Sequence, residues 1–118
     1  KRDRNEGLEG FPLRKSDERS EVAAGIWADM EAPKQNFHPT VKPTNLMRYL
    51  VKLVTPPGGT VLDPFTGSGS TGKAAILEGF DFIGIELTEE YLPIIDARLK
   101  HAEQVRDQQE QAKDEGLF

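Results

Sequence analysis

The sequence has 118 residues, of which 36% are hydrophobic and 30% are charged, a composition that fits one small globular domain. It contains no cysteine, which excludes disulfides, thiolate metal sites and a cysteine nucleophile. No apolar run approaches the roughly 20 residues that cross a bilayer, and no signal-like segment opens the sequence. We therefore expect a cytoplasmic protein with no membrane partner.

The net charge of -5 is unevenly distributed along the chain. Residues 1–59 carry ten basic against eight acidic side chains, whereas residues 60–118 carry five against twelve. A nucleic-acid-binding domain normally shows a basic footprint. We therefore expect any contact with DNA to be made mainly by segments outside this sequence.

Residues 1–36 are predicted to be an irregular polar lead-in. Charges of both signs are mixed with Gly and Pro there, and no periodicity is sustained. One small apolar cluster contains Leu8, Phe11 and Leu13, and the apolar side chains within residues 22–27 have helical spacing over about one turn. The segment therefore offers at most one short helix.

A helix is predicted over residues 43–54. Its apolar residues repeat at intervals of three and four, which is the pattern of one face of a helix. Pro43 suits the first turn, and the run Pro56-Pro57-Gly58-Gly59 ends the helix abruptly. The apolar residues of this face are Leu46, Met47, Leu50, Val51, Leu53 and Val54.

Two strands and a helix around a glycine-rich turn are predicted next. Residues 60–63 have the pattern of a short buried strand, and residues 67–72 form the glycine-rich turn. A helix is predicted over residues 73–78, closed by Gly79. Residues 82–86 are predicted to be a second apolar strand that ends in an acid.

The last predicted element is a helix from about Thr88 onward, with Thr88 as its N-cap. Pro93 would remove a backbone donor in the second turn, so the regular helix is expected to start nearer Tyr91. The apolar stripe stops after Val105, and residues 106–118 are expected to fray into a polar tail. The order strand, helix, strand, helix predicts an α/β fold with a parallel sheet.

The glycine-rich turn has three interpretations. The spacing Gly67-x-Gly69-x-x-Gly72, with Glu86 nineteen residues after the first glycine, fits a dinucleotide fingerprint in which the acid binds ribose hydroxyls. The same stretch nearly fits a phosphate loop, but Ala74 stands where a Ser or Thr hydroxyl is needed for magnesium. The third interpretation depends on the residues that precede the glycines.

Asp63-Pro64-Phe65-Thr66 stands between the first strand and the first glycine, so a carboxylate lies at the carboxyl end of that strand. Because like charges repel, Asp63 is unsuited to a pyrophosphate. It suits a ligand with a cationic end, such as the ammonium of a methionine moiety. With Glu86 on the ribose, this pair predicts S-adenosyl-L-methionine as the cofactor.

The stretch Asp63-Pro-Phe-Thr-Gly-Ser-Gly-Ser-Thr-Gly72 resembles the S-adenosylmethionine-binding motif of DNA adenine-N6 and cytosine-N4 methyltransferases. Just upstream, His38-Pro-Thr-Val-Lys-Pro43 resembles the companion motif that these enzymes place before it. The similarity covers about residues 37–102, and two linked motifs are more specific than either alone. It implies a partial Rossmann-like methyltransferase fold whose cofactor-binding part spans residues 37–105.

The resemblance also implies which residues form the cofactor site. His38, Thr40 and Lys42 would help to build the pocket for the methionine end, since an ammonium and a hydroxyl suit a carboxylate. Without the resemblance, His38 is equally a packing residue and Lys42 a solvated charge. Phe65 and Leu87 either flank the adenine ring or belong to the core. The predicted cofactor-binding residues are His38, Thr40, Lys42, Asp63, Pro64, Phe65, Gly67, Ser68, Gly69 and Glu86.

The implied reaction is methylation of the exocyclic amine of adenine (N6) or cytosine (N4) in double-stranded DNA, in a bacterial or phage restriction-modification setting. In the resembling enzymes a catalytic (Asp/Asn/Ser)-Pro-Pro-(Tyr/Phe) motif precedes the His38 segment, and neither Pro56-Pro57 nor Asp63-Pro64 fits it. No catalytic residue is therefore assigned. Since the sequence opens with Lys1, we expect a C-terminal fragment that is inactive alone, with residues 1–36 as the end of a target-recognition region.

Two alternatives stay open at this point. One is a NAD- or nucleotide-binding module, and the other is an inactive methyltransferase remnant that keeps its cofactor motif. The sequence also leaves open the target base, the recognition sequence and the oligomeric state, with a homodimer among the options.

Overall fold

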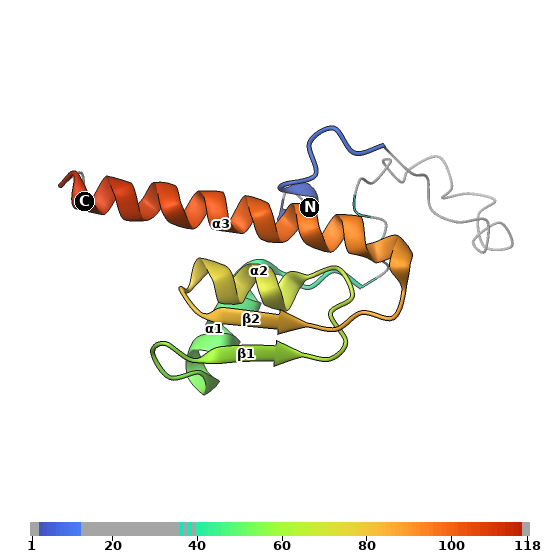
Figure 1. Cartoon of the computed structure of the whole chain (residues 1–118), viewed down its shortest axis with the longest axis horizontal. Helices are drawn as coiled ribbons and strands as arrows, with labels where there is room; N and C mark the ends of the chain where they lie inside the picture. Colours follow the sequence, from blue (N-terminus) through green and yellow to red (C-terminus); the bar gives the residue numbers. More distant parts are fainter. Residues whose placement is uncertain (1–2, 13–35, 37, 39, 117–118) are drawn as a thin grey trace, which may run out of the picture.

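Two short parallel strands and three α-helices make up the framework of the computed structural model, which describes residues 3–12, 36, 38 and 40–116. Strands β1 and β2 pair in parallel, from Thr60 opposite Asp81 to Asp63 opposite Gly84. The predicted α/β class and the parallel pairing are confirmed. The elements, with η for a 3-10 helix, are η1 (Asp3–Asn5), α1 (Thr44–Val54), β1 (Thr60–Asp63), α2 (Ser70–Leu77), β2 (Asp81–Gly84), η4 (Glu89–Tyr91) and α3 (Leu92–Asp114), as Figure 1 shows.

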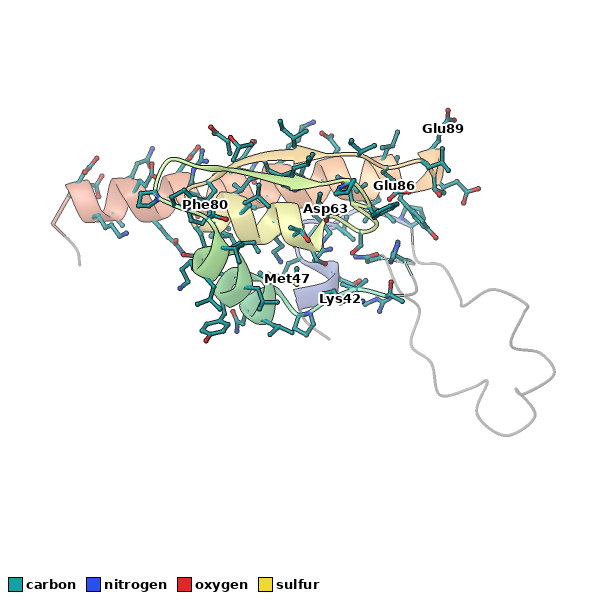
Figure 2. All side chains as sticks on the ribbon, turned by 90° about the horizontal axis from the view of Figure 1, so that it is seen from below. Lys42, Met47, Asp63, Phe80, Glu86 and Glu89 are labelled. Carbon is teal, nitrogen blue, oxygen red and sulfur yellow. The ribbon has the colours of Figure 1, made fainter. Side chains whose placement is uncertain are left out.

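Helix α2 packs on one face of the sheet, and α1 and α3 pack against α2 (Figures 1 and 2). On the other face, Leu62 and Ile83 stand opposite each other in the strand register and are 61% and 55% exposed. The strand predicted over residues 60–63 is present, but the prediction that it is buried is wrong. Within the described residues, helices cover only the α2 side, so alternate side chains of each strand remain exposed.

Gly72 lies where α2 meets both β2 and α3. A Cβ at this position would lie 2.5 Å from Cε1 of Phe82 and 2.7 Å from Cδ2 of Leu99. Such separations are too short for carbon atoms, so the missing side chain allows the helix to approach its neighbours this closely.

We expect Gly72→Ala to lower the free energy of unfolding by about 1–3 kcal/mol, because overpacking outweighs the roughly 1 kcal/mol by which Ala favours a helix over Gly. Urea unfolding followed by circular dichroism measures this effect. Thr71→Ala, one position earlier in the same helix, is the control and should change stability by less. Equal or greater stability of Gly72→Ala would show that the Gly72 contact is not tight.

Two boundaries beside the glycine-rich turn differ from the prediction. Helix α2 begins at Ser70 rather than at residue 73, so Gly72 is inside the helix and not in the turn. The turn ends at Gly69, whose φ of 80° is in the left-handed region that glycine adopts without strain. Strand β2 ends at Gly84, two residues before Glu86.

The long C-terminal helix begins as predicted but extends further. The turn η4 leads into α3 at Leu92, next to the expected start at Tyr91, although the side chain of Thr88 makes no capping hydrogen bond. The expected fraying of residues 106–118 is wrong as far as Asp114, where α3 ends. Gln, Glu, Lys, Arg and Ala dominate this exposed part, and all of them favour helix.

Residues 3–8 of the predicted irregular lead-in are docked on the rest of the protein. Leu8 is fully buried. Gly7 lies so close to α3 that a Cβ there would lie 2.6 Å from Cβ of His101. The predictions for Leu13 and for residues 22–27 concern positions outside the described residues.

Helix α1 has the predicted position, but only part of its apolar surface is buried. Val51 is buried. Leu46, Leu50 and Leu53 are more than two-fifths exposed. The apolar face of α1 is therefore wider than the area that the described residues cover.

Candidate cofactor-binding site

The two predicted acidic site residues lie at the same edge of the sheet. Asp63 is the last residue of β1, and its register partner in β2 is Gly84. Glu86 follows two residues later along the chain. Parallel strands bring their carboxyl ends together, and Figure 2 shows Asp63 and Glu86 on the side of the sheet away from Phe80. This is the edge at which open α/β sheets bind ligands.

Asp63 organises the turn after β1. Its Oδ1 accepts a hydrogen bond from the backbone N–H of Phe65 at 3.0 Å, and its carbonyl accepts one from Oγ1 of Thr66 at 3.1 Å. Within the described part of the chain, no hydrogen bond or ion pair engages the other carboxylate oxygen, Oδ2. One oxygen thus fixes the loop, and the other remains available to a cationic ligand. Beside it, Pro64 is exposed and Phe65 is 88% exposed.

Glu86 connects β2 to the glycine-rich turn. Its Oε2 accepts a hydrogen bond from the backbone N–H of Gly67 at 2.6 Å, and its Oε1 accepts one from that of Thr88 at 2.9 Å. The hydrogen bond from Thr88, followed by that from Gly67, lowers the pKa of the carboxyl group. Glu86 is therefore ionised at neutral pH. Because each carboxylate oxygen accepts more than one bond, the capacity to bind ribose hydroxyls remains.

The glycine-rich turn is fixed from the opposite side by Arg98 of α3, a residue that the sequence analysis missed. Its side chain is fully buried, and its Nη1 donates to the carbonyl of Ser68 at 2.8 Å and to Oγ of Ser68 and of Ser70 at 3.1 Å. Gly67 and Gly69 have positive φ angles of 59° and 80°. Ser68 thus faces the interior, and its hydroxyl holds the loop through Arg98.

His38 lies against this turn. Its Nε2 would be 3.0 Å from a Cβ placed on Gly67, and its ring meets that of Tyr91 edge to face at 4.6 Å between centroids. The Nδ1 atom accepts a hydrogen bond from the backbone N–H of Thr40 at 3.2 Å, so the neutral ring carries its proton on Nε2. Burial lowers the pKa of His38, which favours this neutral form.

Protonation of His38 should destabilise the fold. The group has an ordinary pKa of 6.5, which burial lowers in the folded state. Below that value the unfolded chain takes up a proton that the folded chain does not, so stability falls with pH between the two values. Thermal unfolding between about pH 7 and about pH 5 should show a smaller decrease in His38→Gln than in the unchanged chain. If His38→Gln and the unchanged chain show the same pH dependence, His38 does not cause the loss of stability at low pH.

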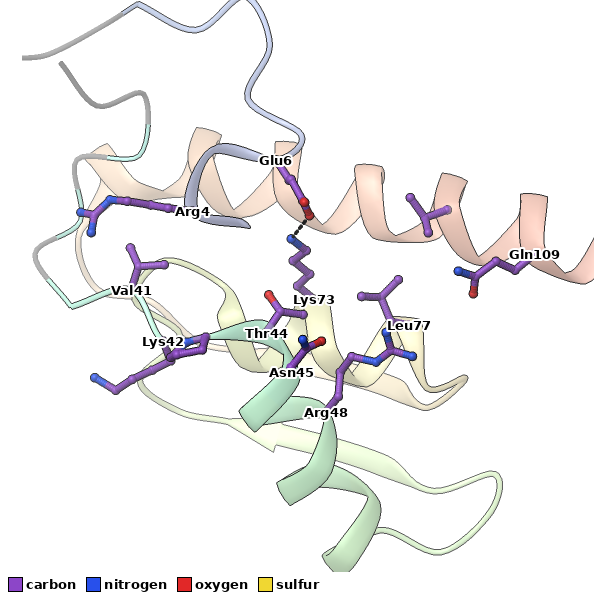
Figure 3. Close-up of a pocket in the computed structure, with 12 residues that line it drawn as sticks. Arg4, Glu6, Val41, Lys42, Thr44, Asn45, Arg48, Lys73, Leu77 and Gln109 are labelled. Carbon is purple, nitrogen blue, oxygen red and sulfur yellow. Dashed lines mark hydrogen bonds and ion pairs between the residues drawn. The ribbon is translucent and has the colours of Figure 1, made fainter. Parts of the chain in front are cut away.

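Lys42 lies apart from the other predicted site residues. It is exposed and lines a cavity of about 610 Å³, which lies among α1, α2 and α3 (Figure 3). Of the described residues that line this cavity, none belongs to a strand. Figure 2 places Lys42 on the helical side of the molecule, away from Asp63 and Glu86. The structure thus brings together His38, Asp63, Phe65, Gly67, Gly69 and Glu86, but not Lys42.

Apart from Lys42, the basic residues that line this cavity are used in contacts within the protein. Lys73 pairs with Glu6 at 2.9 Å, and Arg48 pairs with Glu78. Arg4 donates to backbone carbonyls. The carboxyl edge of the sheet presents a free oxygen of Asp63 and the exposed side chains of Phe65 and Leu87. It is therefore the better candidate for a cofactor site than this cavity.

Two further classes of site find no support in the part of the chain that the structure describes. It contains no group of three or more His, Cys, Asp or Glu side chains that could hold a metal ion. None of its helices combines the length and apolar character that a membrane crossing requires.

The arrangement of a carboxylate, a glycine-rich turn and a second carboxylate across two parallel strands is accompanied by a sequence match over most of the chain. The chain belongs to the DNA methylase family, whose model matches residues 1–97. The family assigned by resemblance is thereby confirmed.

The individual relatives are named as methyltransferases. The chain is 49% identical over 55 residues to the DNA adenine methyltransferase YhdJ of Escherichia coli, which covers 47% of this chain and 19% of that protein. It is 40% identical over 82 residues to the type II methyltransferase M.BglI of Bacillus subtilis, a match that covers 70% of this chain and 24% of that protein. It is 46% identical over 63 residues to the type II methyltransferase M2.DpnII of Streptococcus pneumoniae, a match that covers 53% of this chain and 24% of that protein. The chain thus spans about a quarter or less of these relatives.

Proposed function

We propose that this chain is the S-adenosylmethionine-binding part of a DNA methyltransferase that modifies the exocyclic amine of adenine (N6) or cytosine (N4). The observation that carries the proposal is the placement of Asp63 and Glu86 at the ends of adjacent parallel strands, on either side of the Gly67–Gly69 turn. Family membership supplies the class of reaction and the DNA substrate. The names of the relatives agree with that class.

Each part of the cofactor would meet a chemically suited group. The Oδ2 atom of Asp63 suits the ammonium of the methionine end, and the ionised carboxylate of Glu86 suits the two ribose hydroxyls. Phe65 and Leu87, which are 88% and 96% exposed, would cover the adenine ring. His38 would present its Nε2–H beside the turn. When bound, the cofactor supplies an electrophilic methyl group.

The contribution of these residues is binding and orientation. The fixed turn at Gly67 would hold the cofactor in one pose, and the apolar side chains of Phe65 and Leu87 would exclude water from one face of it. Correct placement of two reactants lowers a barrier because it supplies in advance the entropy of bringing them together. We assign none of the 118 residues to the transfer step itself.

The alternative of a phosphate-binding loop is disfavoured by the position of Lys73. In such a loop this lysine reaches the phosphates. Here its buried side chain pairs with Glu6 at 2.9 Å, on the side of α2 that lines the large cavity (Figure 3). For a dinucleotide, the carboxylate of Asp63 beside the turn would repel the pyrophosphate. An inactive remnant of a methyltransferase would keep the same pocket and bind the same cofactor.

Calorimetric titration of the chain with S-adenosylmethionine, NAD and ATP tests the proposal, after circular dichroism has shown that the chain is folded. We expect binding of S-adenosylmethionine and of S-adenosylhomocysteine, and no binding of NAD or ATP. A folded chain that binds NAD or ATP in preference would overturn the proposal. Methylation of a DNA containing only adenine or only cytosine targets, assayed with the full-length protein, would identify the target base.

A further inference from the structure

A network of hydrogen bonds joins residues 3–8 to the backbone on both sides of position 37. Nε of Arg4 donates to the carbonyl of Asn36 at 2.9 Å, and its Nη2 donates to the carbonyl of His38. In return, Nδ2 of Asn36 donates to the carbonyl of Arg4 at 3.1 Å. One guanidinium group thus holds two carbonyls that lie two residues apart, which a planar fork of donors can do.

Asn36 completes the network from a fully buried position. Its backbone N–H donates to Oδ1 of Asn5 at 3.2 Å, and its own Oδ1 accepts from the backbone N–H of His38 at 3.2 Å. The backbone N–H and carbonyl groups of both Asn36 and His38 are therefore all engaged. Little freedom remains for the backbone that carries the His38 ring.

The segment that supplies Arg4 is itself anchored on the helices. Leu8 is fully buried, and Gly7 packs closely against His101 of α3. Glu6, which follows η1, forms an ion pair with the buried Lys73 of α2 at 2.9 Å, drawn as the dashed line in Figure 3. The hydrogen-bond network thus fixes His38 relative to α2 and α3, the two helices that also hold the glycine-rich turn in place.

We infer that Arg4 and Asn36 are positioning residues of the cofactor site, which fix the backbone of His38 so that its ring stays against Gly67. The inference rests on the proposed function, because the network would form the cofactor site before the ligand binds. A loop that is already ordered does not lose conformational entropy on binding, which strengthens binding. The family model also matches from residue 1, so the segment 3–8 belongs to the same unit as the turn.

The test compares Arg4→Gln and Arg4→Lys with Arg106→Gln, a matched loss of charge on α3. The guanidinium of Arg106 donates to the carboxylate of its neighbour Asp107. We expect Arg4→Gln to weaken S-adenosylmethionine binding about tenfold or more, since charge-assisted hydrogen bonds are lost. Arg4→Lys should restore only part of the affinity, because one ammonium does not reproduce the fork. Arg106→Gln should bind as the unchanged chain does.

A second readout follows the His38 ring and the Gly67 amide by NMR in the same variants without ligand. Arg4→Gln should shift the His38 ring signals and speed exchange of the Gly67 amide, whereas Arg106→Gln should leave both unchanged. If Arg4→Gln does not fold, the binding and NMR measurements are both made on Arg4→Lys.

The outcomes separate the inference from the proposed function. If the unchanged chain binds S-adenosylmethionine and Arg4→Gln binds it equally well, the inference is overturned. If the unchanged chain binds no S-adenosylmethionine, the proposed function fails, and the NMR readout decides the inference alone. In that case unaltered His38 and Gly67 signals in Arg4→Gln would overturn it, and altered signals would support the positioning of His38 by Arg4.

Discussion

Asp63→Asn should weaken S-adenosylmethionine binding by about 10- to 100-fold, because the charge on the oxygen that faces the ligand is lost. Asn keeps an acceptor at the Oδ1 position, so the hydrogen bond from the backbone N–H of Phe65 and the shape of the turn should persist. Calorimetry with S-adenosylmethionine and with 5′-methylthioadenosine, which lacks the amino-acid end, measures the effect. Only the first ligand should lose affinity.

The matched control is Asp81→Asn, which removes an exposed carboxylate at the amino end of β2, the opposite end of the sheet. It should leave both affinities unchanged, since the charge of the chain as a whole contributes little at that distance in salt. Equal losses for both ligands in Asp63→Asn would indicate a collapsed turn instead of a lost ammonium contact. No loss for either ligand would contradict the role given to Asp63.

Arg98→Met should lower the free energy of unfolding by about 2–4 kcal/mol. Met is close to Arg in length but donates no hydrogen bond, so the carbonyl and hydroxyl of Ser68 and the hydroxyl of Ser70 lose a buried charged donor. Removing one partner from a buried polar cluster costs more than a typical surface change. Urea unfolding measures the difference, and S-adenosylmethionine binding should weaken in parallel because the turn loosens.

Arg106→Met on the same helix is the control for Arg98→Met. Its guanidinium contacts the neighbouring carboxylate of Asp107 and is partly exposed, so the change should stay within about 0.5 kcal/mol. If the two variants are equally stable, then the hydrogen bonds of Arg98 do not hold the turn, and the explanation for the loop geometry would have to lie with Glu86 alone.

The parts of the fold and site that could be predicted from the sequence are those that depend on near neighbours in the chain. Strand β1 was predicted at its observed bounds, and Gly79 closes α2 as expected, with a φ of 81°. Asp63 was predicted at the carboxyl end of the first strand and Glu86 at the end of the second, in a parallel sheet. The observed parallel pairing brings both acids to one edge of that sheet, although β2 ends at Gly84. These features follow from local periodicity and from the rules of strand pairing.

The parts that were missed depend on contacts between distant segments. Arg98 occupies the buried face of α3 between Ile95 and Ala102, and a charged residue inside an apolar stripe was the signal that could have revealed it. The docking of residues 3–8 on α2 and α3 left no periodic pattern, because it uses single contacts such as that of Glu6 with Lys73. No composition rule predicts such pairs.

The length of α3 was underestimated for a different reason. The apolar stripe was taken as the measure of the helix, but the exposed segment up to Asp114 is made of residues that favour helix without a core. Conversely, the apolar pattern of α1 led to an overestimate of how much of that helix is buried, since Leu53 is 63% exposed. An amphipathic pattern indicates which face of a helix can be buried, and the tertiary contacts determine how much of that face is buried.

The turn beside the sheet is held by two residues of opposite charge. Glu86 accepts the N–H of Gly67, and Arg98 donates to the carbonyl of Ser68, the next residue. An anion and a cation thus orient successive peptide dipoles from either side, and the turn keeps its shape without a ligand. A rigid receptor of this kind covers its ligand without folding around it. The heat-capacity change of binding should therefore be small, matching the apolar surface of one cofactor molecule.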